Sequence, residues 1–206
     1  MNLKYNYWYF QGVIRPEICD RIIAIGNEKR PQLGQIDRVR KKKEEEFTDE
    51  EIKDLKETRD SHVAFLDIPW IFNIVKPWIQ QANESAGWNF QWDFTESLQF
   101  TKYDVGQYYD WHPDQHHYSY PEDDTNERMR GKFRKLSSTL LLNDPSEFEG
   151  GDLEFHFNMK ETEKATMLNT KGSIVVFPSF VYHRVLPVTK GTRYSLVSWN
   201  LGAPFV

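Results

Sequence analysis

An imidazole and a carboxylate stand two residues apart in this sequence, at His112 and Asp114, where the strand-like run from Tyr103 ends. On an extended backbone, residues i and i+2 point to the same side, so both side chains can reach one metal ion. The best candidate for a third ligand is His183, which follows the apolar run 174–177. Two imidazoles and one carboxylate on one face of an ion form the facial triad of non-haem Fe(II) sites, which leaves the remaining positions open. The sequence therefore predicts an Fe(II) centre at these three residues.

A cation is predicted beside this centre at Arg193, ten residues after His183. Lys190 and Gly191 supply a turn between the two, which places Arg193 on the following predicted strand. A cosubstrate such as 2-oxoglutarate chelates iron through its 2-oxo acid end and leaves its distal carboxylate buried. A bidentate guanidinium can pair with that charge. The alternatives are an exposed strand arginine and a His–Asp pair of purely structural use, but neither explains the joint spacing.

The strands that must position these side chains follow Gly87. Alternating or continuous apolar residues predict strands at Phe90–Phe94, Leu98–Phe100, Leu136–Leu142, Leu153–Phe157, Ile174–Phe177 and Tyr194–Trp199. Turn residues separate them, at 143–145, 150–151, 171–172 and 190–191. Many short strands with turns between them favour a double-sheet jelly roll.

The sequence before Gly87 predicts three helices. Isoleucines at helical spacing after Pro16 predict a first helix that begins near Ile14 and ends at Gly26. Thr48 and Glu51 form a capping box that opens a short polar helix. An amphipathic pattern predicts a third helix from residue 69 to about residue 86. These helices are expected to support the strands.

Length and composition fit one domain, because 206 residues with 39% apolar content suffice for a single substantial core. We expect a mainly β fold with N-terminal helices (α+β), whose core is a double-stranded β-helix, or jelly roll. The expected organisation is one domain over residues 1–206, with helical support in 1–88 and the jelly-roll catalytic core in 89–206.

Charge and cysteine content limit the possible partners. A net charge of −5 and a pI near 5.7 argue against a protein that coats nucleic acid, so a nucleic-acid partner is not expected. Cys19 is the only cysteine, which excludes an intrachain disulfide and a thiolate zinc cage and gives no reason to expect a disulfide-linked partner. No run of about 18 consecutive apolar residues occurs, so no membrane span is expected. These features together favour the cytoplasm.

The larger motifs resemble one known family. They are Gln99–Asp114, Leu136–Pro145, Phe148–Leu153 and Gly172–Trp199. In this order they resemble the Fe(II)- and 2-oxoglutarate-dependent dioxygenase superfamily, specifically its prolyl 4-hydroxylase-like branch and the bacterial PKHD-type hydroxylases. The resemblance extends from about Arg59 to Gly202.

The resemblance implies roles for individual residues. His112, Asp114 and His183 would bind iron and form the catalytic centre, and Arg193 would pair with the distal carboxylate of 2-oxoglutarate. Halogenase relatives lack the metal-binding carboxylate, so Asp114 favours hydroxylation.

Four further residues match positions around the pocket. Tyr103 matches a tyrosine whose hydroxyl contacts the cosubstrate, Trp199 matches a tryptophan beside the iron, and Tyr109 occupies a position that lines the substrate pocket. Several relatives place a tyrosine where this sequence has Leu141, so another hydroxyl must contact the distal carboxylate. Thr139 is our candidate for that contact.

The activity implied by the resemblance is oxidative decarboxylation of 2-oxoglutarate to succinate and CO2, coupled to hydroxylation of a C–H bond. Fe(II), 2-oxoglutarate and O2 are the implied cofactor and cosubstrates, with ascorbate as a candidate reductant. The implied substrate is a protein or peptide residue, with proline favoured by the resemblance alone. The alternatives are a hydroxylase of a small molecule or free amino acid and a catalytically silent jelly-roll binding module; nucleic-acid demethylation fits the acidic balance less well.

Two polar segments have no place in the predicted core. Residues 30–46 carry a block of basic residues followed by glutamates, and residues 115–132 combine His116 and His117 with aromatic and acidic residues. One hypothesis is that both segments fold over an extended polypeptide. The alternative is that they are solvated surface loops without substrate contacts.

Overall fold

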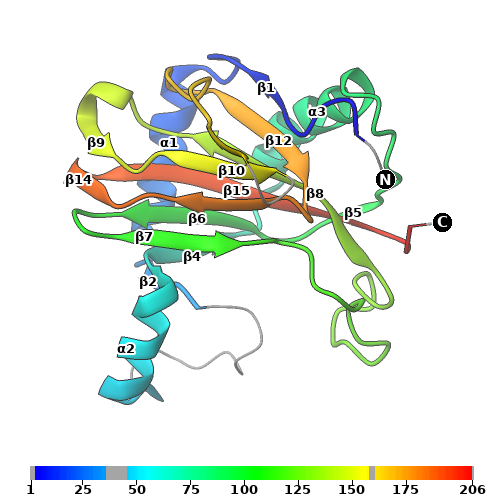
Figure 1. Cartoon of the computed structure of the whole chain (residues 1–206), viewed down its shortest axis with the longest axis horizontal. Coiled ribbons are helices and arrows are strands. Elements are labelled where there is room, and N and C mark those ends of the chain that lie inside the picture. Colours follow the sequence, from blue (N-terminus) through cyan, green and yellow to red (C-terminus); the bar gives the residue numbers. More distant parts are fainter. Residues whose placement is uncertain (1–2, 36–45, 158–160, 206) are drawn as a thin grey trace.

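The computed structural model describes residues 3–35, 46–157 and 161–205. Two antiparallel sheets face each other, and helices α1 (Pro16–Glu28) and α3 (Pro69–Ser85) cover the outer face of the larger sheet (Figure 1). This arrangement is the jelly-roll fold that the sequence predicts.

The large sheet has the strand order β1-β12-β8-β15-β6-β4-β2, and β5 pairs with β15. Its strands are β1 (Trp8–Phe10), β2 (Gln32–Leu33), β4 (His62–Leu66), β5 (Phe94–Thr95), β6 (Leu98–Tyr103), β8 (Phe133–Leu141), β12 (Ile174–Pro178) and β15 (Arg193–Gly202). Three of these strands, β1, β2 and β4, come from residues before 89, so the N-terminal part contributes to the sheet as well as to its helical cover.

The small sheet has the order β11-β10-β13-β7-β3. Its strands are β3 (Arg59–Asp60), β7 (Tyr108–His112), β10 (Leu153–Phe157), β11 (Glu161–Lys164) and β13 (Tyr182–Val185). A separate pair is formed by β9 (Phe148–Gly150) and β14 (Val188–Gly191), and a 3-10 turn spans Pro145–Glu147. Residues 190 and 191 are thus the end of a strand rather than a hairpin turn, and the chain passes through them from the β9–β14 pair into the large sheet.

The helices follow from local sequence signals. Pro16 occupies the first turn of α1, where its missing N–H costs nothing. Helix α2 (Asp49–Thr58) has the expected capping box, with Thr48 and Glu51 each bonded to the other's backbone N–H. None of the helices in the described residues is long and apolar enough to cross a membrane.

The sequence predicts that α1 ends at Gly26, because glycine commonly ends helices. In the structure the helix continues to Glu28. A methyl group on Gly26 would lie 2.4 Å from the ring of Phe100 on β6. The glycine therefore allows α1 to pack closely against the sheet. Its role is close approach rather than helix termination.

The two faces of the large sheet differ because side chains alternate along each strand. On the outer face, β6, β8, β12 and β15 pack against the helices with a set of large apolar residues that includes Phe100, Leu136, Leu140, Val176 and Leu196. On the inner face, Val175 and Phe177 pack against Leu153, Phe155 and Val185 of the small sheet. Polar residues also occupy that inner face, and they form the site.

The predicted strand at Phe90–Phe94 is largely wrong, because only Phe94 and Thr95 form a strand. The side-chain amide of Asn83 accepts from the backbone N–H of Phe90 and donates to its carbonyl, both at 2.9 Å. These bonds satisfy the backbone groups that a strand partner would otherwise take.

Candidate metal centre and cosubstrate pocket

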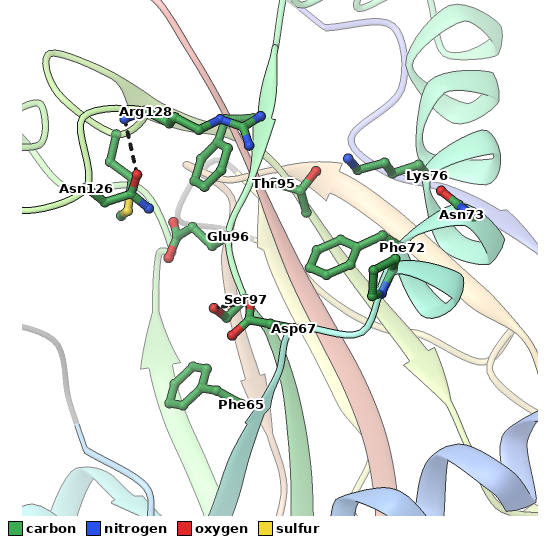
Figure 2. A pocket seen from close by; sticks show the side chains of 13 residues that line it. Phe65, Asp67, Phe72, Asn73, Lys76, Thr95, Glu96, Ser97, Asn126 and Arg128 are labelled. Carbon is green, nitrogen blue, oxygen red and sulfur yellow. Dashed lines mark hydrogen bonds between the residues drawn. The ribbon is translucent and has the colours of Figure 1, made fainter.

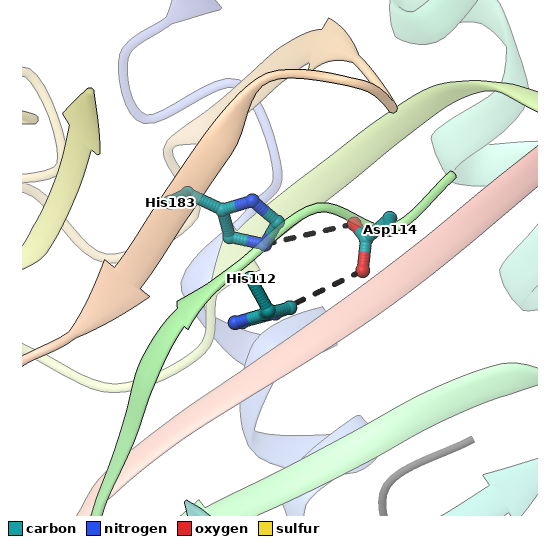
Figure 3. A group of neighbouring side chains, drawn as sticks. All are labelled: His112, Asp114 and His183. Carbon is teal, nitrogen blue, oxygen red and sulfur yellow. Dashed lines mark ion pairs between the residues drawn. The ribbon is translucent and has the colours of Figure 1, made fainter. Parts of the chain in front are cut away.

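The two histidines lie on neighbouring strands of the small sheet. In the antiparallel register of β7 and β13, His112 and His183 are direct partners, and their ring centroids are 4.2 Å apart. Asp114 lies two residues beyond the end of β7 and turns its carboxylate toward both rings (Figure 3). The structure thus brings together all three residues predicted to bind a metal.

The ring nitrogens are arranged for ligation. Nδ1 of His112 lies 2.7 Å from the backbone carbonyl oxygen of Asp110, and Nδ1 of His183 lies 3.1 Å from that of Val181. These carbonyls hold the proton on Nδ1 and leave Nε2 as the free electron pair. Nε2 of His112 is 3.9 Å from Oδ1 of Asp114, and Nε2 of His183 is 3.6 Å from Oδ2 of Asp114.

Electrostatics keep His112 and Asp114 in the form that a cation needs. Burial, and then the neighbouring His183, lower the pKa of His112 to about 3. Burial opposes ionisation of Asp114, but His183 and His112 hold its pKa below the ordinary value. At neutral pH the site is therefore a neutral imidazole beside a carboxylate, as metal binding requires.

The donor set fits a divalent ion. One ligand atom from each of the three residues lies within 4.8 Å of the others. Oδ2 of Asp114 is buried and has no hydrogen-bond partner among the described residues. A buried carboxylate oxygen without a partner is costly unless a cation binds it. Two imidazoles and one carboxylate suit Fe(II) with open positions.

Arg193 lies on the same inner side of the sandwich. It is the register partner of Tyr103, its guanidinium carbon is 5.7 Å from the centre of that ring, and the residue is 2% exposed. Burial lowers its pKa. Within the described residues, its guanidinium donates one side-chain hydrogen bond, from Nη1 to Oγ of Ser195 at 3.2 Å. A buried guanidinium without a carboxylate partner is a site for an anion.

Tyr103 connects this cation to the metal centre. Burial raises the pKa of its hydroxyl, while Arg59 and Arg193 oppose that rise and Asp114 adds to it. The hydroxyl therefore stays protonated and can donate a hydrogen bond between the two ends of the pocket.

The other predicted pocket residues are placed as follows. Thr139 is buried on β8, where its register partners are Val175 and Val197 on the inner face. Trp199 is buried, and its indole N–H has no partner in the described residues. The ring of Tyr109 stacks on His112 with a centroid distance of 3.5 Å, and burial raises the pKa of Tyr109 to about 12.

The sequence reasoning missed Ser195 and Arg59. Ser195 bonds Arg193, and strand alternation from that residue could have found it. Arg59 is 4% exposed, with its guanidinium carbon 4.6 Å from the centre of the Tyr109 ring. It donates to Oγ of Ser61 and to the carbonyl of Gln35, while Nη2 has no partner in the described chain. The signal in the sequence that could have identified Arg59 is its charge at the start of a strand that is buried.

A buried ion pair was also missed. Arg134 donates to both carboxylate oxygens of Glu96, at 2.6 and 2.7 Å, and Glu96 raises its pKa against the opposing effect of burial. Its guanidinium carbon lies 4.0 Å from the centre of the Trp199 ring, and Nη1 is 3.4 Å from the backbone oxygen of Asp114. This pair forms the wall of the pocket beside the metal ligand.

Comparisons with known proteins agree with this geometry. The family model of the 2OG-Fe(II) oxygenase superfamily matches residues 98–200, half of the chain. The chain therefore belongs to the 2OG-Fe(II) oxygenase superfamily. Fe(II), 2-oxoglutarate and O2 are the cofactor and cosubstrates that this family implies, and the residues above fit them.

Its similar sequences include PKHD-type hydroxylases. One from Gloeothece citriformis is 39% identical over 105 residues, which cover 50% of this chain and 41% of that protein. One from Psychrobacter sp. is 36% identical over 100 residues, which cover 48% of this chain and 36% of that protein. The matched segments thus span about two fifths of the length of these relatives.

Solved structures of similar fold include prolyl hydroxylases. A Pseudomonas putida prolyl-4-hydroxylase has a TM-score of 0.64 at 17% identity, over 96% of this chain and 92% of that chain. A Trichoplax adhaerens prolyl hydroxylase, solved with a peptide fragment of hypoxia inducible factor, has a TM-score of 0.67 at 16% identity, over 96% and 84%. These similarities support the jelly-roll assignment.

Proposed function

We propose that this protein is an Fe(II)- and 2-oxoglutarate-dependent hydroxylase that acts on a residue of a peptide or protein, with proline as the favoured target. The observation that supports the proposal is the presence of two buried features near Tyr103. One is a three-ligand metal site, and the other is an arginine that has no anionic partner in the described residues. A dicarboxylate that chelates the metal would supply that partner.

The proposal assigns separate roles to the metal ligands and to the residues that contact the cosubstrate. His112 and His183 would hold the ion through Nε2, and Asp114 would hold it through its carboxylate. Bound iron supplies the activation of O2 that couples decarboxylation of 2-oxoglutarate to hydroxylation. Arg193 would orient the distal carboxylate of the cosubstrate, and Tyr103 would donate a hydrogen bond from its hydroxyl to the cosubstrate.

Other residues keep the reacting groups in place and dry. Phe155 and Phe177 pack against His183, with ring-centroid distances of 6.4 and 4.7 Å, and exclude water on that side. Tyr109 restricts the rotation of His112 by stacking on it, and Arg59 covers the other side of Tyr109. We infer that these contacts fix the ligand geometry before substrate binds.

The peptide substrate is inferred from relatives. Prolyl hydroxylases share the fold, and one of them was solved with a peptide. Peptidyl proline is therefore the first substrate class to test.

The test measures succinate and peptide mass together. The full-length protein is incubated with Fe(II), 2-oxoglutarate and a pool of proline-containing peptides in air. We expect succinate formation that the peptides stimulate and the mass gain of one oxygen atom on a peptide proline. Stimulation by free amino acids instead would contradict the peptide assignment, and absence of succinate under all conditions would contradict the enzyme assignment.

A further inference from the structure

A groove of about 680 Å³ lies on the surface between β4, β5 and α3 (Figure 2). It is bounded by the connection from β4 to α3, the first turns of α3, the β5–β6 turn and residues 126–129. None of the residues in its walls belongs to the metal triad. The function of the groove therefore needs a separate explanation.

Three aromatic rings contribute to the groove wall, among polar and charged residues. Phe72 comes from α3, Phe94 from β5 and Phe65 from β4, and Phe65 is 46% exposed. Large exposed apolar side chains gathered in a groove mark a binding surface. Grooves lined by aromatic rings suit extended or polyproline-type peptide segments, whose flat side chains pack against the rings.

Two cations lie on two of these rings. The ammonium of Lys76 is 5.4 Å from the ring centre of Phe72, and the guanidinium carbon of Arg128 is 4.5 Å from that of Phe94. Neither has a carboxylate within 4.0 Å among the described residues of the chain. The groove wall also holds the carboxylates of Asp67 and Glu96, but Glu96 is paired with Arg134. The wall therefore carries two cations and one carboxylate that have no ion-pair partner among the described residues, which leaves a positive balance for a ligand.

The groove adjoins the metal centre at the Glu96–Arg134 pair, which forms a wall between the two. Glu96 lines the groove and also accepts both hydrogen bonds from Arg134, which lies against Trp199 and the backbone of Asp114. Phe65 is the register partner of Gln99, on the inner face that also carries Arg193. The groove therefore lies next to the metal centre, on the other side of the Glu96–Arg134 pair.

The segment 115–132 is held against this region. Tyr120 donates its hydroxyl to Glu96 at 2.9 Å, and Lys132 pairs with Asp93 at 2.6 Å. Within the segment, backbone bonds join Tyr120 and Lys132, and Gly131 and Tyr120. These bonds give Arg128 and Asn126 a fixed position in the groove wall.

We propose that the groove binds the part of the peptide substrate next to the hydroxylated residue, and that this part carries acidic side chains. The inference rests on the proposed peptide hydroxylation and adds the charge of the substrate to it. Phe65, Phe72 and Phe94 contact apolar side chains of the peptide. Lys76 and Arg128 pair with its carboxylates.

The first test measures binding. Two pools of short fluorescent peptides share a central proline and apolar neighbours, and differ only in carrying aspartate and glutamate or carrying lysine. Fluorescence polarisation is measured with the full-length protein, Fe(II) and 2-oxoglutarate in the absence of O2. We expect the acidic pool to bind more tightly, with an affinity that falls as salt is added.

Charge-reversal variants then test whether the acidic peptides bind in the groove. The double variant Lys76→Glu, Arg128→Glu should bind the acidic pool about tenfold more weakly, since each exposed pair contributes about threefold. The matched control is Lys4→Glu, Arg21→Glu. These cations also lie on aromatic rings, those of Tyr5 and Trp70 at 5.2 and 4.6 Å, but they do not line the groove. The control should bind both pools like the unchanged protein.

The outcomes separate this inference from the proposed function. Equal binding of the two pools, no binding of either pool, or an unchanged affinity in the Lys76, Arg128 double variant would overturn the groove assignment. Conversion of 2-oxoglutarate to succinate without peptide should be the same in both double variants and the unchanged protein. If that conversion is absent from the unchanged protein, the proposed function itself fails.

Discussion

The two faces of the large sheet are built by the same strands and have opposite uses. On β8, Leu136 and Leu140 face the helices, whereas Ser137 and Thr139 face the small sheet. On β15, Leu196 faces the helices, whereas Arg193 and Ser195 face the pocket. The outer face contributes stability through apolar burial, and the inner face holds groups that gain partners only when ligands bind. The same strands can therefore support both stability and ligand binding, because the apolar cluster that packs against the helices lies on the outer face.

Removing a metal ligand should have the largest effect on the inner face. His112→Ala or Asp114→Ala should abolish iron-dependent succinate formation, because a facial triad with two ligands cannot hold the ion with its open positions. The folded structure should remain, since the outer core is untouched. Succinate assays and circular dichroism test both points.

The matched control is Asp123→Ala, which removes an exposed carboxylate from segment 115–132. It should keep its activity. Turnover that survives loss of Asp114 would refute the triad.

The reverse case is a change to the outer face. Leu140→Ala should cost about 2–5 kcal/mol of unfolding free energy, because Leu140 is fully buried and its loss leaves a cavity. The folded protein should keep its affinity for 2-oxoglutarate. Urea unfolding and cosubstrate binding by calorimetry measure the two effects. A loss of affinity as large as the loss of stability would show that the two faces are not independent.

Arg193→Ala should separate binding from stability on the inner face. We expect 2-oxoglutarate to bind about a hundredfold more weakly, because a buried charge pair is lost. The ligand-free protein should be as stable as before or more stable, because an unpaired buried cation is removed. Arg193→Lys should show an intermediate loss, since lysine keeps the charge without the planar fork. An unaltered affinity for 2-oxoglutarate in Arg193→Ala would refute the assigned role.

The metal-free site should also make stability depend on pH. The pKa of His112 is lowered to about 3 by burial and is ordinarily 6.5, so between these values the unfolded chain binds more protons than the folded one. Stability contributed by the neutral imidazole is therefore present above pH 6.5 and lost as the pH falls, by about 2 kcal/mol at pH 5.

His112→Gln isolates this contribution from that of other groups. Chemical unfolding with metal removed should show a smaller loss between pH 7 and pH 5 in the variant than in the unchanged protein. Equal losses would show that His112 is not a buried neutral base.

The smallest expected effect concerns the hydroxyl predicted to contact the distal carboxylate of 2-oxoglutarate. Thr139→Ala should weaken 2-oxoglutarate binding only a few-fold, about the value of one hydrogen bond. Ser195→Ala is the comparison, because Ser195 is the hydroxyl that bonds Arg193 in the structure. If only Ser195→Ala weakens binding, the role predicted for Thr139 belongs to Ser195.

The site ligands could be predicted because their chemistry is local. His112 and Asp114 are close in sequence, and the strand before His183 is a plain apolar run. That His183 lies opposite His112 is a property of β-strand register over 71 residues, which only the folded chain displays. Segment 30–46 mostly falls outside the described residues, so both alternatives for it, folding over a polypeptide or lying as a solvated surface loop, stay hypotheses.

The Glu96–Arg134 pair could not be predicted, because a bulge reverses the alternation. Counting back from Leu136 places Arg134 on the outer face. In the structure the register passes from Leu136 opposite Asn200 to Arg134 opposite Leu201, so Lys135 is skipped. This bulge turns Arg134 toward Trp199. For segment 115–132 the sequence showed polarity, but not the bond from Tyr120 to Glu96 that holds it to the sheet.

The central claim is that three side chains hold one ferrous ion while Arg193 holds the far end of 2-oxoglutarate. A crystal structure of the full-length protein grown with Fe(II) and 2-oxoglutarate without O2 tests it most directly. The account predicts one iron bound by Nε2 of His112, Nε2 of His183 and the Asp114 carboxylate, with the distal carboxylate of 2-oxoglutarate paired to Arg193. Iron bound elsewhere, or a cosubstrate that does not reach Arg193, would contradict it.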